Sequence, residues 1–387
     1  MVNQEIKISP NSKQRSAIEH PPSPLMILAG AGTGKTFTLE NRIVYLIKEY
    51  KVDPKHLLAI TYTEKAAKEL KNRVIEKVGA KAHSMTVNTF HAFCYKLLRD
   101  NDFSSKQLLD ESEAVHMFLT RFDELKPFES TEFPLDPQKA ITESFMPFFN
   151  RMRDELIDPE KVKVSQLKDD DTLTNETRQQ LSDLKRIYPL FQSWKEELNV
   201  VDYGDMILSA YQMISTNKSI LKNIQDNYRH IVIDEFQDNN FALNEIVNLI
   251  AGKRNYVTAV GDDDQVIYSF RGANNFNIQA FRERYGDHEK YQSIALETNY
   301  RSNQAILDLA NESIKNNAER VEKTLTSYLK ASGEKPVRFW GEKSQQLDYL
   351  INEILYLNNE GIRCKDIAVL CRTHGQATIV MEALSCL

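Results

Sequence analysis

A glycine-rich turn near the start of the chain carries the residue types that hold a phosphate group. Residues 25–36 read LMILAGAGTGKT, an apolar run followed by alternate glycines and a Lys-Thr pair. Glycines let the backbone approach a triphosphate closely and point successive N–H groups towards it. Lys35 can reach the β- and γ-phosphates, and the Thr36 hydroxyl can complete the coordination of Mg²⁺. The predicted phosphate-binding loop (P-loop) consists of Ala29, Gly30, Ala31, Gly32, Thr33, Gly34, Lys35 and Thr36. The alternative is a glycine-rich strand–helix turn with an incidental lysine.

An acidic pair directly follows an apolar run in the second half of the chain. Residues 231–235 read IVIDE. Opposite a P-loop, Asp234 would hold Mg²⁺ directly or through water, and Glu235 would orient and deprotonate an attacking water. An acidic pair after a strand is also a common helix N-cap. The P-loop upstream favours the catalytic interpretation.

Polar and aromatic residues gather after the next apolar run. Residues 256–260 read YVTAV, and GDDDQ follows at 261–265. A carboxylate cluster at the carboxyl end of a parallel strand lies on the sheet edge where ligands bind. Tyr268, Phe270 and Arg271 come shortly afterwards. Such a group packs a corner in some proteins and stacks on bases in others, so both interpretations stay open here.

The elements that must position these residues alternate between strands and helices. Apolar runs at 57–62 and 85–90 predict strands, and apolar residues at helical spacing within 38–48 and 91–98 predict helices. This alternation predicts an α/β fold with a parallel sheet that is covered by helices on both faces.

The pattern becomes almost wholly helical between about residues 100 and 200. Apolar residues recur at helical spacing from Leu181 to Leu198, which is typical of a packed core, and prolines divide the segment into several helices. We therefore predict a helical subdomain inserted into the α/β domain. Further on, a helix over 344–357 and a strand over 367–370 are expected to begin a second α/β unit.

Composition limits the kind of protein this chain can be. Its 387 residues are too many for one ordinary core, so two or three domains are expected. A net charge of −6 excludes a global basic field, so any nucleic-acid surface must be a local groove. The four cysteines form no C-x-x-C pair, which predicts a reducing, cytoplasmic location. Neither a signal pattern nor an apolar run of membrane-spanning length occurs, so no membrane partner is expected.

Several separate stretches match one protein family in order. They are Asn11-x-x-Gln14, 29–36 (AGAGTGKT), 61–67 (TYTEKAA), 89–91 (TFH), 234–238 (DEFQD), 261–273 (GDDDQVIYSFRGA) and 299–302 (NYRS). On these stretches the chain resembles the superfamily 1 DNA helicases of the UvrD/Rep/PcrA group. The resemblance spans essentially the whole chain, and the helical insert matches in position and character only.

The resemblance implies ATP and Mg²⁺ as cofactors and assigns roles around them. Gln14 would read the adenine edge, Tyr300 would stack on the base, and Arg42 would belong to the nucleotide contacts. Gln265 would sense the γ-phosphate, and Arg301 would stabilise charge on the transferred phosphoryl group. The implied catalytic set is Lys35, Glu235, Gln265 and Arg301.

The resemblance also implies a surface for single-stranded DNA, with partly duplex DNA as a further partner. The implied contacts are Tyr62, Thr89, His91, Tyr268 and Phe270. Two positions depart from the family pattern. Phe270 stands where the family often has Trp, which keeps a stacking face and loses the indole N–H. Phe37 stands where an Arg often follows the Lys-Thr pair.

The family organisation implies four segments. Residues 1–100 and 201–290 would form the first RecA-like ATP-binding domain, 101–200 the inserted helical subdomain, and 291–387 the first half of a second RecA-like domain. The family continues beyond this point with a second insertion and the rest of the second motor domain. We therefore expect this chain alone to turn over poorly, with a protein partner as one source of the missing half.

The sequence thus predicts an ATP-dependent DNA helicase or translocase, with 3′-to-5′ polarity implied by the family alone. One alternative is a truncated, ATP-gated module that binds single-stranded DNA without turnover. Another is a P-loop kinase or switch NTPase unrelated to DNA. Against the kinase stands the group of Gln265, Tyr268, Phe270 and Arg271, which a small-molecule kinase would not need. The biological pathway stays open.

Overall fold

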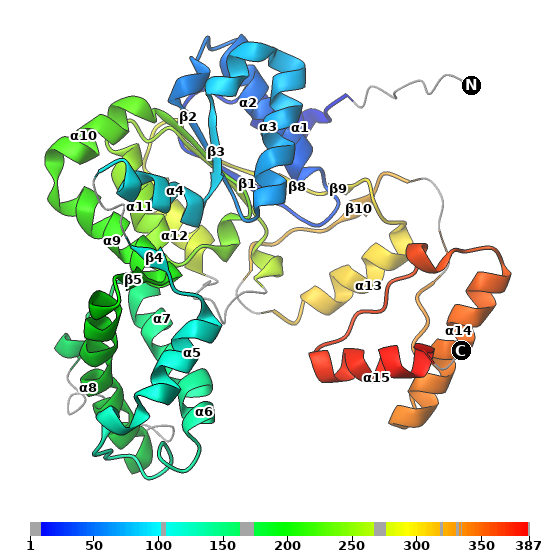
Figure 1. Ribbon diagram of the computed structural model, residues 1–387. Helices are drawn as coiled ribbons and strands as arrows, with labels where there is room; N and C mark the ends of the chain where they lie inside the picture. The colour runs from blue at the N-terminus through cyan, green and yellow to red at the C-terminus, as the bar shows by residue number, and fades with distance from the viewer. Residues whose placement is uncertain are drawn as a thin grey trace. The chain divides into compact units, whose positions relative to one another are not determined.

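The computed structural model of the protein describes residues 9–101, 106–162, 174–266, 276–317, 320–329, 333 and 335–385. The chain forms two compact units, 1–331 and 332–387, which are drawn in Figure 1. No helix within the described ranges is long and apolar enough to cross a membrane. The four-segment division expected from the sequence stays a prediction.

A six-stranded sheet lies at the centre of the first unit, in the order β3-β2-β6-β7-β1-β8. Its strands are β1 (Leu25–Ala29), β2 (Leu57–Thr61), β3 (Thr86–Thr89), β6 (His230–Ile233), β7 (Val257–Gly261) and β8 (Gln292–Leu296). Every neighbouring pair is parallel. The carboxyl ends of all six strands therefore share one edge. This arrangement confirms the predicted RecA-like α/β class.

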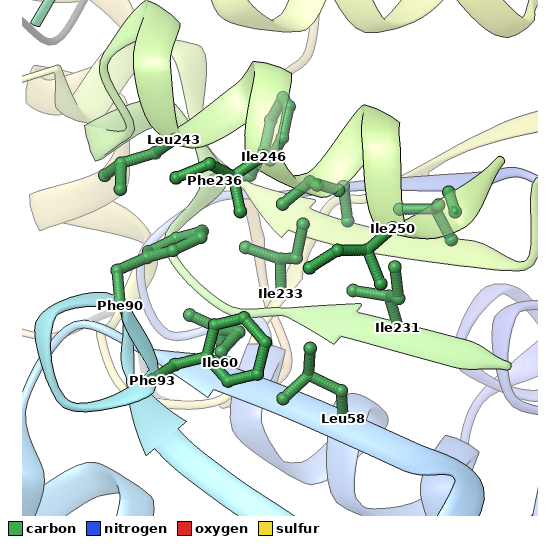
Figure 2. Close-up of a cluster of buried hydrophobic side chains, with 14 of the residues drawn as sticks. Leu58, Ile60, Phe90, Phe93, Ile231, Ile233, Phe236, Leu243, Ile246 and Ile250 are labelled. Atoms are coloured by element: carbon green, nitrogen blue, oxygen red, sulfur yellow. The ribbon is translucent and has the colours of Figure 1, made fainter. Parts of the chain in front are cut away.

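Alternate residues of each strand enter two hydrophobic cores on opposite faces of the sheet. In β1, Met26 and Leu28 join one core, and Leu25 and Ile27 join the other. Strands buried on both faces read as continuous apolar runs, which is why they could be predicted from the sequence. Figure 2 shows part of the first core, where side chains of β2 and β6 meet those of two neighbouring helices.

Helices cover both faces of the sheet. One face carries α1 (Ser12–Glu19), α2 (Lys35–Lys48) and α3 (Glu64–Val78). The other carries α4 (Phe90–Arg99), α9 (Tyr203–Thr216), α10 (Lys218–Asn227), α11 (Phe241–Ala251) and α12 (Phe276–Tyr285). Side-chain caps mark several of the helix starts: Asn11 accepts from the Gln14 N–H, and Thr63 accepts from the Ala66 N–H.

A helical segment lies between β3 and β6 in chain order. It contains α5 (Glu111–Thr120), α6 (Pro137–Lys139), α7 (Met146–Asp154) and α8 (Asn175–Glu197), and the short strands β4 (Gln107–Leu108) and β5 (Val200–Val201) pair in parallel. Its own core is rich in aromatic rings, among them Phe118 and Phe191 with ring centres 4.6 Å apart. Of the apolar stripe predicted along α8, Leu184, Tyr188, Phe191 and Trp194 pack into this core. Leu181 is only partly buried and does not belong to the core, and Leu198 is about half exposed.

A buried ion cluster ties the helical segment to α9. Arg153 of α7 donates to Asp202 at 2.6 Å and to Asp205 at 2.8 Å, and Lys195 of α8 lies 2.5 Å from Asp205. The cluster pairs two cations with two carboxylates, so no net charge is buried. A Cβ at Gly204 would lie 2.7 Å from the Arg153 guanidinium, so the close approach requires glycine there.

The remaining elements lie beyond β8. The first unit ends with β9 (Thr298–Asn299), α13 (Gln304–Ile314) and β10 (Thr326–Ser327), and β10 pairs in parallel with β9. The second unit contains α14 (Lys343–Asn359) and α15 (His374–Ser385), and none of its described residues is buried. The strand predicted at 367–370 is wrong. A strand needs a hydrogen-bonded neighbour, and the described part of this unit offers none, so Leu370 is 96% exposed.

Candidate active site

The predicted P-loop connects β1 to α2. Gly32 has φ 73° and Gly34 has φ 85°, both in the left-handed region that favours glycine. The Thr33 N–H and hydroxyl both donate to the Gly30 carbonyl, at 3.3 and 2.7 Å, and these bonds close the turn. A Cβ at Gly32 would lie 2.6 Å from the Asn299 amide nitrogen, so the loop excludes a side chain there for two independent reasons.

The start of α1 supports the P-loop through two amide side chains. Gln14 is buried; its Nε2 donates to the Thr33 carbonyl at 3.0 Å, and its Oε1 accepts from the Asn11 N–H at 3.0 Å. Asn11 Nδ2 donates to the Tyr300 hydroxyl at 2.9 Å. Asn11 thus links Gln14 to Tyr300, two predicted nucleotide contacts that are 286 residues apart in the chain (300 minus 14).

The end of β9 and the residues after it hold the P-loop from another direction. Asn299 is buried, and its Nδ2 donates to the Ala31 carbonyl at 2.6 Å. Its Oδ1 accepts the N–H groups of Arg301 and Ser302 at 2.8 and 2.7 Å, and the Tyr300 N–H donates to the Gly32 carbonyl at 2.8 Å. Arg301 is thereby held beside the loop. Sequence reasoning missed Asn299, whose one signal was its position in the Asn-Tyr-Arg-Ser stretch.

The predicted lysine and glutamate meet across the site. Lys35 Nζ lies 2.6 Å from Glu235 Oε2, and this pair joins α2 to the end of β6. Glu235 has φ 50°, an unusual backbone conformation for a residue other than glycine. Thr36, on the first turn of α2, has an exposed side chain.

Carboxylates outnumber the lysine in this part of the site. Burial, followed by the charge of Glu235, raises the pKa of Asp234 to about 6, although Lys35 opposes the shift. The same two causes raise the pKa of Asp238 to about 6. Asp238 Oδ1 is buried without a hydrogen-bond partner among the described residues. Several carboxylate oxygens lie close together here, and one of them has no hydrogen-bond partner among the described residues. Such oxygens are the ligands that a divalent cation prefers, so these residues suit Mg²⁺.

Gln237 connects the Lys35–Glu235 pair to the acidic turn after β7, which consists of Asp262, Asp263 and Asp264. Gln237 Nε2 donates to Glu235 Oε2 at 3.0 Å, and Gln237 Oε1 accepts the Asp262 N–H at 3.0 Å. Gln265, which lies on the short 3₁₀ helix Asp263–Gln265, donates to the Asp262 carboxylate. The predicted catalytic residues Glu235 and Gln265 thus belong to one hydrogen-bond network. Sequence reasoning did not single out Gln237.

Arg42 lies in the interior instead of facing the P-loop. Its guanidinium donates to the carbonyls of Ile18 and Pro21, at 3.0 and 3.1 Å, and to that of His20. Burial lowers the pKa of Arg42 to about 10. These contacts hold the end of α1 against α2. The nucleotide contact expected of Arg42 stays a prediction.

The predicted DNA contacts that the structure describes lie at the carboxyl ends of β2 and β3. Tyr62 follows β2, and Thr89 ends β3 and caps α4 by accepting the Ala92 N–H at 3.3 Å. His91 is exposed, and its ring meets that of Tyr203 edge-on at 5.2 Å. These positions share the sheet edge with the P-loop because all the strands are parallel. Tyr268, Phe270 and Arg271 lie outside the described residues.

The parallel sheet, its glycine-rich loop after β1 and the acidic pair after β6 together define a RecA-like P-loop protein. The chain matches the family model described as the UvrD/REP helicase N-terminal domain over residues 10–286. Residues 294–386 match the model of the UvrD-like helicase C-terminal domain. The chain therefore belongs to the UvrD/REP helicase family.

Curated relatives of the chain are named as ATP-dependent DNA helicases. The chain is 32% identical over 382 residues to the ATP-dependent DNA helicase PcrA of Staphylococcus epidermidis (strain RP62A), covering 96% of this chain and 49% of that protein. The ATP-dependent DNA helicase PcrA of Staphylococcus aureus (strain Mu50) shows the same identity and coverage. The chain spans about half the length of the curated relatives it matches.

Proposed function

We propose that this protein is an ATP-dependent DNA helicase or translocase that moves along single-stranded DNA with 3′-to-5′ polarity and acts on partly duplex DNA. Family membership and the helicase names of the relatives support this proposal. The observation that carries it is the Lys35–Glu235 pair, which joins a P-loop to the acidic end of β6 within a RecA-like sheet. Cytoplasmic location belongs to the same proposal.

The proposed nucleotide contacts surround the P-loop. Backbone N–H groups of residues 30–35 and the positive end of α2 bind the phosphates, and Lys35 reaches the terminal ones. Thr36 and Asp234 would hold Mg²⁺, which neutralises charge on the phosphates when it is bound. Gln14 reads the edge of the adenine, and Tyr300 stacks on its face. The hydrogen bonds that link Gln14 to Tyr300 through Asn11 support a common site.

The proposed chemistry is an in-line attack of water on the γ-phosphate. Lys35 neutralises Glu235 in the nucleotide-free protein, and a phosphate that competes for Lys35 releases the Glu235 carboxylate. Glu235 then orients the water and accepts its proton. Arg301 stabilises the charge of the transferred phosphoryl group, and Gln265 contacts the γ-phosphate.

The proposed DNA surface consists of the residues at the ends of β2 and β3 together with the aromatic residues after β7. Aromatic side chains stack on bases of any type, so binding with little sequence preference is expected. Tyr62, Thr89 and His91 share a sheet edge with the nucleotide contacts, which supports coupling between the two sites. The non-hydrolysing DNA-binding module is not favoured, because the relatives are named ATP-dependent helicases.

The test measures Mg-ATP binding by calorimetry and ATP hydrolysis with and without single-stranded DNA. Lys35→Ala should weaken Mg-ATP binding about tenfold or more, since it removes the cation aimed at the phosphates. Glu235→Gln should still bind Mg-ATP and should hydrolyse it roughly 10²-fold or more slowly than the parent chain, whose own turnover is expected to be low. Lys55→Ala, which removes an exposed lysine paired with Asp53, is the control and should change neither quantity. Unchanged binding in Lys35→Ala would contradict the proposal.

A further inference from the structure

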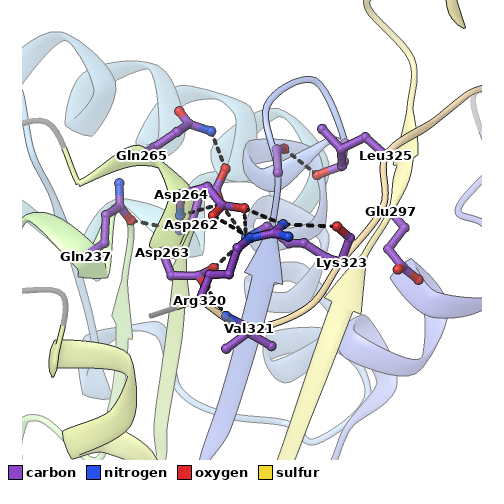
Figure 3. Close-up of polar contacts among 12 residues, drawn as sticks. Gln237, Asp262, Asp263, Asp264, Gln265, Glu297, Arg320, Val321, Lys323 and Leu325 are labelled. Carbon is purple, nitrogen blue, oxygen red and sulfur yellow. Dashed lines mark hydrogen bonds and ion pairs between the residues drawn. The ribbon is translucent and has the colours of Figure 1, made fainter. Parts of the chain in front are cut away.

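A buried lysine fills the acidic turn after β7. The Lys323 ammonium lies 3.0 Å from Asp262, 2.5 Å from Asp263 and 2.6 Å from Asp264, and the Lys323 side chain is 2% exposed. Figure 3 shows these contacts. The three carboxylates have oxygen atoms close enough to hold a metal ion. Since the ammonium lies among them, the lysine supplies the positive charge that the cluster needs.

Arg320 also binds the acidic turn, next to Lys323. Arg320 donates through two nitrogens to the two carboxylate oxygens of Asp264, both at 3.0 Å, and also to the Lys323 carbonyl at 3.1 Å. The Val321 N–H donates to Asp263 at 2.5 Å. A paired, two-point contact of this kind fixes both distance and orientation. The chain from Arg320 to Lys323 is thus bound to all three aspartates.

The same segment continues onto the P-loop. A Cβ at Gly30 would lie 2.6 Å from the Leu325 side chain, so Leu325 packs directly on the loop. The Tyr328 N–H donates to the Asn299 carbonyl at 2.8 Å, and its ring lies 4.9 Å from the ring of Tyr300. Residues 320–328 therefore contact the acidic turn, the P-loop and the proposed base-stacking tyrosine in succession.

Hydrogen bonds connect Lys323 to the proposed catalytic residues. One carboxylate oxygen of Asp262 meets Lys323, and the other accepts from Gln265. The Asp262 N–H donates to Gln237, which donates in turn to Glu235. The orientation of Asp262 therefore affects Gln265, which would contact the γ-phosphate, and Glu235, which would orient the attacking water.

We propose that Lys323, together with Arg320, is a positioning residue for ATP hydrolysis. It fixes Asp262, and through Asp262 it sets the orientation of Gln265 and of the Gln237–Glu235 pair. This inference rests on the proposed function. Because Gln265 would contact the γ-phosphate, which ADP lacks, loss of Lys323 affects binding of a triphosphate more than binding of a diphosphate.

The test compares the affinities of the chain for a non-hydrolysable ATP analogue and for ADP, both with Mg²⁺, by titration calorimetry. Lys323→Met removes the ammonium group and keeps a side chain of similar length. Arg320→Gln removes the guanidinium group, which is less buried than the Lys323 ammonium. Lys195→Met is the matched control, because Lys195 is an equally buried lysine on two aspartates in the helical segment. A melting curve for each variant reports general damage to the fold.

Lys323→Met should bind the ATP analogue about tenfold more weakly and ADP within about twofold of the parent. Arg320→Gln should change the ratio of the dissociation constants for the ATP analogue and ADP about threefold. Its melting temperature should stay near that of the parent. If Lys323→Met does not fold, the ratio in Arg320→Gln tests the positioning role. Lys195→Met should melt earlier and keep the ratio of the parent.

Two results would overturn the inference in different ways. If the parent binds both nucleotides and neither Lys323→Met nor Arg320→Gln changes the ratio, the positioning role is wrong and the proposed function stands. If the parent binds neither nucleotide, the proposed function and the positioning role are both wrong.

Discussion

Asn299 offers a quantitative test of how the P-loop is held. Its side chain is buried and makes three hydrogen bonds: one to the Ala31 carbonyl at 2.6 Å and two from the N–H groups of Arg301 and Ser302 at 2.8 and 2.7 Å. A typical intramolecular hydrogen bond contributes about 1 kcal/mol to stability, so Asn299→Ala should lower the free energy of unfolding by about 3 kcal/mol.

Urea denaturation followed by circular dichroism measures this loss. Asn303→Ala is the matched control, since Asn303 stands four residues on and accepts one N–H, that of Ile306, as the cap of α13. The loss of such a cap costs about 1 kcal/mol. The two variants should therefore differ by about 2 kcal/mol. Equal losses would refute the reasoning that Asn299 holds the loop. Mg-ATP affinity should also fall in Asn299→Ala and stay unchanged in Asn303→Ala, because of these two asparagines only Asn299 donates a hydrogen bond to the P-loop.

Three further predictions concern the same site. Asp234 has a pKa raised to about 6 in the nucleotide-free protein, so the folded state binds more protons than the unfolded state between about pH 4 and 6. Stability should fall as the pH rises through that window, and Asp234→Asn should melt higher than the parent at pH 7 by scanning calorimetry; an unchanged melting temperature would contradict this. Gly34→Ala should lower the free energy of unfolding by about 1 kcal/mol or more, because φ is 85° and the new Cβ would lie 2.8 Å from Gln14. Equal urea midpoints for variant and parent would argue against backbone strain at this position. Phe270→Ala should weaken single-stranded DNA binding by about 1–3 kcal/mol with little dependence on base sequence, as measured by fluorescence anisotropy, and parent-like affinity would rule out stacking by this residue.

The sequence alone was enough for the P-loop turn and for strands such as β1 and β6. Strands such as β1 and β6 are buried on both faces, so each appears as an unbroken apolar run, and the loop between β1 and α2 depends on glycines that have no substitute at positive φ. The strand expected at 367–370 failed for the complementary reason. Its apolar pattern is local, and a strand forms only where a neighbour supplies hydrogen bonds.

Contacts between distant segments were decided by the tertiary structure. Lys35 and Glu235 are 200 residues apart, and they meet because the strand order brings the ends of β1 and β6 to one edge of the sheet. Nothing local distinguishes Lys323 from the other basic residues among the 49 in the chain, and nothing local shows that Arg42 is buried. Helix and strand periodicity reports only which face of an element is apolar. Which charged side chain lies against which partner depends on the packing of whole elements, and this decided that Lys323 lies among the three aspartates and that Arg42 holds α1 to α2.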